Sequence, residues 1–466
     1  MPLPVISIAQ MRQWEKATWA TGQTEAEVIR RVGKLVGQYA LRLTHPGDLI
    51  LILAGNGNNG EDARSARDHL GERRIHLLEV KDPAADLSKL GAGLSLGPVL
   101  VIDGLFGIGL NRPLSEDWVL FIDCVNAARV PVLAVDVPSG LNADSGVPYG
   151  AVMEAAITLT IGAPKVGLLL PPAAPFVGRL EVAAQVGLIP CPIQSEVQWT
   201  TEEDFLRYPP GRAVGSHKGT YGHLAILAGS LGYHGAAVLA ARAAQRAQPG
   251  LITLYPQEEV YGPVASQLQA VMFSPWQAET KLPGSATAVL AGPGLAAPEL
   301  PDTLKTAVRH FWRDADMPVI VDASALDWLQ QDLVVKNALR VITPHPGEAA
   351  RMLRCPVQQV QTNRFAAVRE LSNRFGNAWV ILKGHQTLIG RKTGEIYINN
   401  SGNPYLAQGG SGDVLAGLVA GLLAQPGLQS DPLTALRYAA WKHGAAADQL
   451  VSSRKNWVVE DLLQEL

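Results

Sequence analysis

Three uninterrupted apolar runs in the first half of the chain constrain the fold most strongly. They read DLILILAG at residues 48–55, VLVIDGLFG at 99–107 and VPVLAVDVPSG at 130–140. A run without alternating polar positions is typical of a strand that is buried on both faces of a parallel sheet. Helix-length stretches separate the runs, and strands that alternate with helices predict an α/β fold.

The same rhythm resumes after an interruption at residues 200–218, where acidic residues, consecutive prolines and glycines replace the apolar runs. We therefore expect a domain boundary between residues 208 and 209, which divides the chain into domains 1–208 and 209–466. The second part contains further runs that predict short buried strands, followed by a helical tail at 432–450. The predicted strands are at 222–229, 251–255, 288–292, 319–321, 341–342 and 379–382.

Composition excludes several classes of protein. The 466 residues suggest two or three domains, and 47% apolar with 17% charged residues excludes a disordered chain. A net charge of −3 is too balanced for a protein that neutralises nucleic-acid phosphates, and three cysteines provide no disulfide framework. The N-terminus has no signal-peptide pattern, and the apolar run at 414–424 is shorter than the ~20 residues of a membrane span. We expect a cytoplasmic protein with neither a nucleic-acid nor a membrane partner.

Each of the three clearest strands is followed by a polar, glycine-bearing loop. Because the carboxyl ends of parallel strands meet at one edge of a sheet, Asn59, Asp103 and Ser139 would present oxygen atoms there. An all-oxygen set with one carboxylate suits a hard cation rather than zinc. Each loop alone also fits an ordinary turn, and the first is not the G-x-G-x-x-G dinucleotide fingerprint.

In the second half, the segment QGGSGD at residues 408–413 precedes an apolar helical run. Small residues that enter a helix offer backbone amides to an anion, and Asp413 in the first turn can accept a proton from a hydroxyl that attacks a phosphoryl group. The alternative is that the helix dipole alone favours an acid there. The loop KGHQT at 383–387 suits phosphates. His345 between two prolines and Gly294 in a tight turn fit either a structural or a binding role.

Eight motifs together resemble one known family. In chain order they read GNGNNGEDA, VIDGLFGIGLNRP, AVDVPSGL, HKGTYGHLAILAGS, AGPGL, TPHPGE, LKGHQT and AQGGSGDVLAG. This order, from about residue 7 to about residue 462, is similar to that of the bifunctional NAD(P)H-hydrate repair enzymes. The resemblance implies a Rossmann-like N-terminal domain with epimerase activity, followed by a ribokinase-like domain with ADP-dependent dehydratase activity.

The resemblance also implies the substrates, NADHX and NADPHX, which are hydrated at C6 of the nicotinamide ring. The epimerase would interconvert the R and S hydrates. The dehydratase would phosphorylate the C6 hydroxyl of the S form with ADP, and phosphate would then leave to restore NAD(P)H. The cofactors implied are K⁺ in the epimerase domain and Mg²⁺ in the dehydratase domain, and we expect a homo-oligomer.

The same resemblance assigns roles to individual residues. In the N-terminal domain, the hydrate would be bound by Asn58, Asn59, Gly60, Glu61, Asp62, Gly107, Ile108, Gly109, Leu110, Asn111, Arg112, Pro113 and Asp136, and potassium by Asn59, Asp103 and Ser139. In the second domain, the hydrate would contact Ala236, Gly294, His345 and the catalytic Asp413. The nucleotide would be bound by Lys383, Gly384, His385, Gln386, Thr387 and Gly412.

The first loop departs from the family pattern NNGGDG, because Glu61 and Ala63 stand where the pattern has glycine. A carboxylate beside ligand phosphates repels them, which predicts a working but weakened epimerase. The alternatives are that Glu61 points to solvent and that Ala63 occupies an ordinary helical position. Two rival functions also remain: a ribokinase-like small-molecule kinase, whose phosphorylated product would be stable, and a non-catalytic N-terminal binding module.

Overall fold

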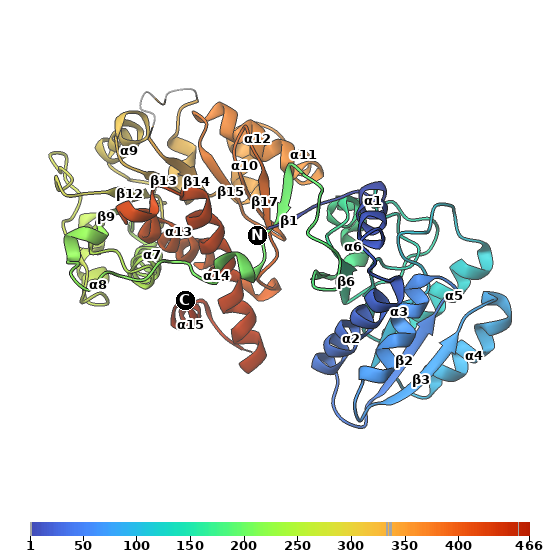
Figure 1. Ribbon diagram of the computed structural model, residues 1–466. Coiled ribbons are helices and arrows are strands. Elements are labelled where there is room, and N and C mark those ends of the chain that lie inside the picture. The colour runs from blue at the N-terminus through green and yellow to red at the C-terminus, as the bar shows by residue number, and fades with distance from the viewer. Residues whose placement is uncertain (1, 332–333, 335–337, 455) are drawn as a thin grey trace. The chain divides into compact units, whose positions relative to one another are not determined.

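The computed structural model describes residues 2–331, 334, 338–454 and 456–466 and contains two compact units (Figure 1). Leu3–Glu196 form the N-terminal unit and Val197–Leu466 the C-terminal unit. This division lies earlier in the chain than the expected boundary at 208/209, because β8 (Val197–Trp199) pairs in parallel with β17 (Ile396–Asn399) and so joins the second sheet. No helix among the described residues is long and apolar enough to cross a membrane.

The N-terminal unit is built on a parallel sheet with the strand order β3-β2-β4-β5-β6-β7. The three predicted strands are present as β2 (Leu49–Ala54), β4 (Leu100–Gly104) and β5 (Val132–Val135), each shorter than its apolar run. They are shorter because the polar residues that end each run form loops at the carboxyl edge. The remaining strands are β3 (Arg74–Glu79), β6 (Ile157–Ile161) and β7 (Arg179–Ala183).

Helices cover both faces of this sheet, which explains why every residue of β2 is buried. On one face, α2 (Glu25–Leu43) and α3 (Asn58–Ala66) share a core with the strands; on the other, α4 (Pro83–Ser95) and α5 (Glu116–Ala127) do so (Figure 1). A capping box at Thr24 and Glu27 fixes the start of α2. The unit also contains β1 (Leu3–Pro4), α1 (Ile8–Trp19) and α6 (Ala174–Val177).

The C-terminal unit has a larger sheet, and the strands that residues 197–466 contribute to it run in the order β8-β17-β16-β15-β14-β13-β12-β9-β10-β11. All six predicted strands are present, and their pairing is parallel. The antiparallel pairs are β15 with β16 and β16 with β17. Strand β16 returns antiparallel to β15 because the turn at 383–386 is too short for a crossover helix. The strands not yet given are β9 (His223–Leu227), β10 (Leu251–Tyr255), β11 (Met272–Phe273), β12 (Ala288–Ala291), β13 (Val319–Val321), β14 (Arg340–Ile342), β15 (Trp379–Leu382) and β16 (Thr387–Gly390).

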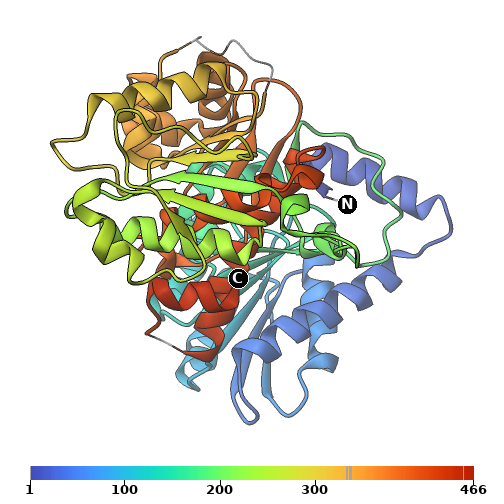
Figure 2. The same ribbon diagram turned by 90° about the vertical axis from the view of Figure 1, so that its left-hand side faces the viewer.

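The helices of this unit lie on both sides of its strands. In Figure 2 the yellow and orange helices α9 (Asp302–Asp314), α10 (Pro346–Leu353) and α12 (Arg364–Arg374) lie on one side, and the green and red helices α7 (His234–Arg246), α13 (Ser411–Leu423) and α14 (Pro432–Ser453) lie on the other. Helix α13 is buried nearly all round, and a Cβ on Gly417 would lie 2.1 Å from the Ala240 carbonyl oxygen. Glycine therefore lets α13 pack directly on α7. The shorter helices are α8 (Tyr261–Ala265), α11 (Val357–Thr362) and α15 (Val459–Glu465).

Candidate active sites

A pocket of about 470 Å³ opens at the carboxyl edge of the N-terminal sheet. It is lined by the predicted binding residues Asn58, Asn59, Asp62, Gly107, Ile108, Gly109, Leu110 and Asp136. Gly60, Glu61, Asn111, Arg112 and Pro113 are not among the described residues that line it. Helix α1, helix α5 and the loops after β4 and β6 add side chains that the sequence reasoning missed, including Met11, Arg12, Glu15, Phe106, Trp118 and Lys165.

The three residues predicted to hold potassium flank one loop of this pocket. The buried carboxylate of Asp103 accepts hydrogen bonds from the Ser139 hydroxyl at 2.6 Å and from the Ser139 N–H at 2.9 Å. The Ser139 Oγ in turn accepts from the Phe106 N–H at 2.9 Å. The side chain of Asn59 faces the same loop, since a Cβ on Gly107 would lie 3.2 Å from its Cγ. Burial raises the pKa of Asp103 to about 6.

The amide of Asn59 is the one feature of this cluster that its neighbours leave unsatisfied. Both its Oδ1 and its Nδ2 are buried without a hydrogen-bond partner within the described residues. A buried polar group without a partner is costly, so such a group calls for an explanation such as a bound ion. A cation that is ligated by oxygen would satisfy Oδ1, and Asp103 would supply the charge. The donor set of Asn59, Asp103 and Ser139 therefore fits potassium.

Asp136 forms the second polar centre of the pocket. Its Oδ1 accepts hydrogen bonds from the Lys165 ammonium at 2.6 Å, the Ile161 N–H at 3.1 Å and the Thr160 hydroxyl at 3.3 Å. Lys165 is completely buried, and its residue type at this place was not anticipated. Asp136 has a left-handed backbone with a φ of 65°, a conformation that non-glycine residues adopt rarely.

Two further carboxyl groups of the pocket have a raised pKa. Burial, followed by the charge of Asp136, raises the pKa of Glu15. The same two causes raise the pKa of Asp62 well above its usual range. The pocket therefore combines an ion pair with carboxyl groups that hold a proton more readily than usual, and such groups suit proton transfer.

The two residues that depart from the family pattern lie outside this polar centre. The Glu61 carboxylate is exposed and pairs with the Arg64 guanidinium at 2.9 Å. Ala63 is buried inside α3, against Gly104 of β4, without a left-handed backbone. Gly60 is required by packing, because a Cβ there would lie 2.0 Å from the Gly55 carbonyl oxygen. The geometry thus favours the alternatives in which Glu61 points to solvent and Ala63 is an ordinary helical residue.

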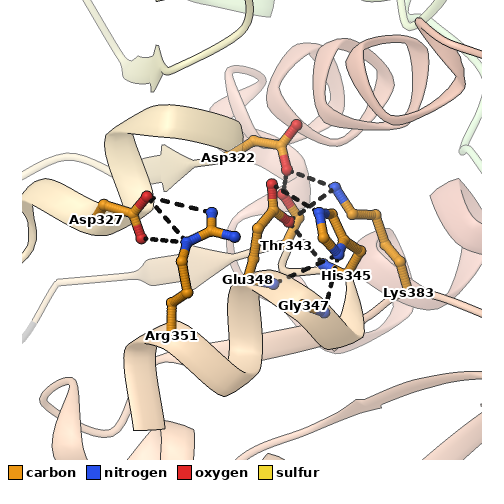
Figure 3. A network of polar contacts seen from close by, with 8 residues as sticks. All are labelled: Asp322, Asp327, Thr343, His345, Gly347, Glu348, Arg351 and Lys383. Carbon is orange, nitrogen blue, oxygen red and sulfur yellow. Dashed lines mark hydrogen bonds and ion pairs between the residues drawn. The ribbon is translucent and has the colours of Figure 1, made fainter. Parts of the chain in front are cut away.

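A network of polar side chains lies at the carboxyl ends of β13, β14 and β15 in the C-terminal unit (Figure 3). At its centre the Lys383 ammonium lies 2.7 Å from Asp322 Oδ1 and 3.8 Å from Glu348 Oε2. The Thr343 hydroxyl donates to the same Asp322 oxygen at 2.6 Å. Asp322 is buried and was not predicted. Lys383 therefore stands as the counter-ion of two carboxylates.

His345 begins α10 as its N-terminal cap. Its Nδ1 accepts a hydrogen bond from the Gly347 N–H at 3.0 Å, and its backbone N–H donates to the Glu348 carboxylate at 2.7 Å (Figure 3). The imidazole is half exposed, with its Nε2 3.6 Å from the Glu348 carboxylate. The capping role that the sequence left open is therefore present. The exposed edge of the ring is still available to a ligand.

Asp413 lies in the first turn of α13, beside this network. A Cβ on Gly412 would lie 3.2 Å from the Lys383 ammonium, so the start of α13 adjoins Lys383. Asp413 has no hydrogen-bond partner within the described residues. Burial and the charge of Asp322 raise its pKa to about 7, although Lys383 opposes the shift. A carboxylate with this pKa can take and release a proton near neutral pH.

Ala236 and Gly294, which the family resemblance assigns to the hydrate, lie against each other. A Cβ on Gly294 would lie 2.9 Å from the Ala236 methyl carbon. The buried hydroxyl of Ser230 donates to the Gly294 carbonyl at 2.6 Å and accepts from the Ala297 N–H at 3.0 Å. Ser230 is the last residue of the motif HKGTYGHLAILAGS, and the sequence analysis predicted no role for it.

Two family models match the chain. One, described as NAD(P)H-hydrate dehydratase, matches residues 224–466, and the other, described as YjeF-related protein N-terminus, matches residues 74–167. The bifunctional NAD(P)H-hydrate repair enzyme Nnr of Gloeobacter violaceus is 32% identical over 96% of this chain and 94% of its own length. The chain belongs to the family of bifunctional NAD(P)H-hydrate repair enzymes.

Solved structures agree with this membership of the repair-enzyme family. The ADP/ATP-dependent NAD(P)H-hydrate dehydratase of Bacillus subtilis, co-crystallised with ATP/Mg²⁺, matches with a TM-score of 0.50 and 32% identity, over 55% of this chain and 91% of its own. A ribokinase-like superfamily protein of Enterococcus faecalis, 24% identical over 58% of this chain and 94% of its own, matches with a TM-score of 0.50 and shows the fold alone. The predicted fold class and the predicted repair function, an epimerase joined to a dehydratase, are confirmed.

Proposed function

We propose that the site around Asp413 dehydrates the S form of NADHX or NADPHX with ADP. The observation that carries this proposal is the position of Asp413, a half-buried carboxylate in the first turn of α13 that lies next to Lys383 and has no hydrogen-bond partner among the described residues. Asp413 would take the proton of the C6 hydroxyl as its oxygen attacks the terminal phosphoryl group of ADP. The bond between that group and the rest of ADP breaks, and AMP leaves.

The phosphorylated intermediate then loses phosphate. The C6–O bond breaks, a proton leaves C5, and the ring regains its double bond. Phosphate leaves more readily than water, which explains why a kinase-like fold serves a dehydratase. On this proposal His345, Ala236 and Gly294 contact the hydrate. The half-exposed imidazole of His345 and the direct contact of Ala236 with Gly294 support these roles.

The nucleotide would lie on Lys383, Gly384, His385, Gln386, Thr387 and Gly412. Backbone amides at the start of α13 and the Lys383 ammonium provide positive charge for its phosphates. Asp322 Oδ2, which faces Gly412 at 4.0 Å from a Cβ placed there, would help to hold Mg²⁺ together with the phosphates. Mg²⁺ bound there would neutralise charge that develops during phosphoryl transfer.

We further propose that the N-terminal pocket binds the hydrate for epimerisation through Asn58, Asp62, Asp136 and the 107–110 loop, while Asn59, Asp103 and Ser139 hold K⁺. Support comes from the unsatisfied amide of Asn59 and from the ion pair of Asp136 with Lys165. Potassium bound there would supply positive charge beside a phosphorylated ligand. Self-association into a homo-oligomer stays a prediction, which sedimentation of the full chain would check.

The full chain incubated with a mixture of R and S hydrates tests these assignments. With ADP, both epimers should disappear as inorganic phosphate and the absorbance of the dihydropyridine ring appear together. Without ADP, the two epimers should interconvert without gain of absorbance, faster in K⁺ than in choline buffer. A stable phosphorylated product would identify an ordinary kinase instead. Failure of the R hydrate to react would identify a non-catalytic N-terminal module.

We expect Glu61→Gly to change the KM of the epimerase for the R hydrate by less than about twofold, because an exposed ion pair contributes little. The carboxylate pairs with Arg64 rather than facing the pocket. Asp62→Asn is the matched control, since Asp62 lines the pocket one position away, and its loss should change this KM several-fold. Initial rates at low salt would measure both. A markedly lower KM for Glu61→Gly would show that Glu61 reaches the ligand after all.

The pKa of Asp413 predicts the acidic limb of the dehydratase pH profile. Because burial and Asp322 raise this pKa to about 7, the base is increasingly protonated below that pH, and kcat/KM should fall about tenfold per unit at the acidic end. Above about pH 7 the rate should level off. Asp322→Asn removes the neighbouring negative charge and should move the limb to lower pH. An unchanged limb in Asp322→Asn would mean that another group titrates.

A further inference from the structure

Arg364, the first residue of α12, forms hydrogen bonds with the turn between β15 and β16. Its Nη1 donates to the carbonyls of His385 and Gln386, and its Nη2 to those of Leu382 and Lys383. One side chain therefore binds four carbonyls in a stretch of five residues. No local sequence pattern indicates these contacts, because α12 and the turn are separated along the chain.

The turn itself has an unusual backbone. Gly384 has a φ of 127° and Gln386 a φ of 54°, and a left-handed conformation is unfavourable for a side chain such as that of glutamine. Residues in such conformations persist where the surrounding structure holds them in place. The four hydrogen bonds of Arg364 stabilise this backbone conformation. Without them the turn is expected to relax.

The hydrogen bonds of Arg364 also fix the direction in which the backbone N–H groups of the turn point. In a trans peptide the C=O of one residue and the N–H of the next point in opposite directions. Because the Lys383 and His385 carbonyls face Arg364, the N–H groups of Gly384 and Gln386 face away from it. These two N–H groups have no acceptor within the described residues. Free amides of one turn form a concavity that suits an anion.

Arg364 also contributes charge beneath this turn. Burial lowers the pKa of its guanidinium to about 10, so it stays charged at neutral pH. No carboxylate forms an ion pair with it in the part of the chain that the structure describes. Its charge is therefore balanced by carbonyl dipoles alone, and the field on the opposite side of the turn favours an anion.

We propose that Arg364 is a positioning residue that pre-forms the phosphate-binding amides of the nucleotide loop without touching the nucleotide. This inference rests on the proposed assignment of residues 383–387 to ADP. Since the hydrogen bonds are made within the protein, Arg364 acts on the affinity for ADP rather than on the chemistry at Asp413.

The test measures ADP binding by calorimetry, and kcat and KM of dehydration, in full-length Arg364→Ala and Arg364→Lys. In Arg364→Ala the Kd and the KM for ADP should both rise on the order of 10-fold, because binding must now order the turn, while kcat at saturating ADP stays within about threefold. Arg364→Lys should be intermediate, since an ammonium cannot span four carbonyls as a guanidinium fork does.

The matched control is Arg374→Ala on the same helix, where Arg374 binds the Leu353 carbonyl and Glu370 away from the turn. Its ADP constants should equal those of the parent.

Epimerase activity of each preparation reports whether the N-terminal unit is intact, and thermal melting reports the C-terminal unit. If Arg364→Ala has a lower melting temperature than the parent, ADP binding is measured well below that temperature. The ADP affinity of Arg364→Lys then tests the positioning role. Parent-like ADP affinity in a folded Arg364→Ala, or an equal loss in Arg374→Ala, would overturn the proposal. If Lys383→Ala also leaves ADP affinity unchanged, the assignment of the loop to the nucleotide fails. If Lys383→Ala weakens ADP and Arg364→Ala does not, only the role of Arg364 fails.

Discussion

Asp413→Asn should lower the rate of ADP-dependent dehydration by ~10²–10⁴-fold, the usual cost of removing a general base. The amide has the same shape and keeps hydrogen-bonding capacity, but it cannot take the proton of the C6 hydroxyl. The position supports this outcome, since the carboxylate is half-buried, has a pKa of about 7 and adjoins Lys383 at the start of α13. Initial rates of phosphate release at saturating ADP and hydrate would measure the loss.

The rival explanation for Asp413 is a first-turn acid that only complements the helix dipole. Asp302 supplies the matched control, because it is an exposed acid in the first turn of α9 that pairs with Lys305 of the same helix. Asp302→Asn should cost a few tenths of a kcal/mol of stability and no activity. Asp413→Asn should leave the Kd for ADP within about threefold of the parent, since the charge lost is negative. Near-parental turnover in Asp413→Asn would remove Asp413 from its catalytic role.

Lys383→Ala should weaken ADP binding on the order of 100-fold and leave epimerisation by the N-terminal unit unchanged. Two effects add. The phosphates lose their ammonium partner, and Asp322, whose charge Lys383 balances at 2.7 Å, becomes an uncompensated buried anion that repels them. The loss should shrink as salt rises, because mobile ions screen both terms. Titration calorimetry at two salt concentrations would measure it.

The ion pair makes a second variant necessary, since breaking a buried pair costs ~3–5 kcal/mol of stability. Combining Lys383→Met with Asp322→Asn removes both charges and should recover most of the stability lost by Lys383→Ala. ADP affinity should stay well below that of the parent, because the ammonium is still missing. If the double variant instead recovered parental ADP affinity, Lys383 would serve to neutralise Asp322 and not to bind phosphate.

Sequence reasoning located the strands best where the apolar pattern is uninterrupted. The runs at 251–255, 319–321 and 379–382 coincide with β10, β13 and β15. It missed β3, whose residues are mostly half-buried because it is an edge strand. The sequence reasoning also missed the antiparallel direction of β16. The apolar pattern of β16 is that of any buried strand, and its direction depends on the length of the turn before it.

The loops at the strand ends were predictable for the same reason. Parallel strands bring their carboxyl ends to one edge, so Asp103 and Ser139 had to lie near each other once their strands were neighbours. Which loop residues face the pocket was not predictable. Asp62 faces it and Glu61 does not, because the helical period of α3 turns adjacent residues to different sides.

The two α/β units, the family, and the loops and helix start that carry Asp103, Lys383 and Asp413 were predictable from the amino-acid sequence, because they follow from local patterns and from motif order. The side chains that surround these residues were not predictable in this way. Asp322 lies 61 residues before the lysine that it pairs with, and Arg364 binds carbonyls up to 22 residues away. No local pattern encodes such partners. They meet only because the sheet aligns strands from distant parts of the chain, and burial then leaves each charge dependent on the neighbour that the fold supplies.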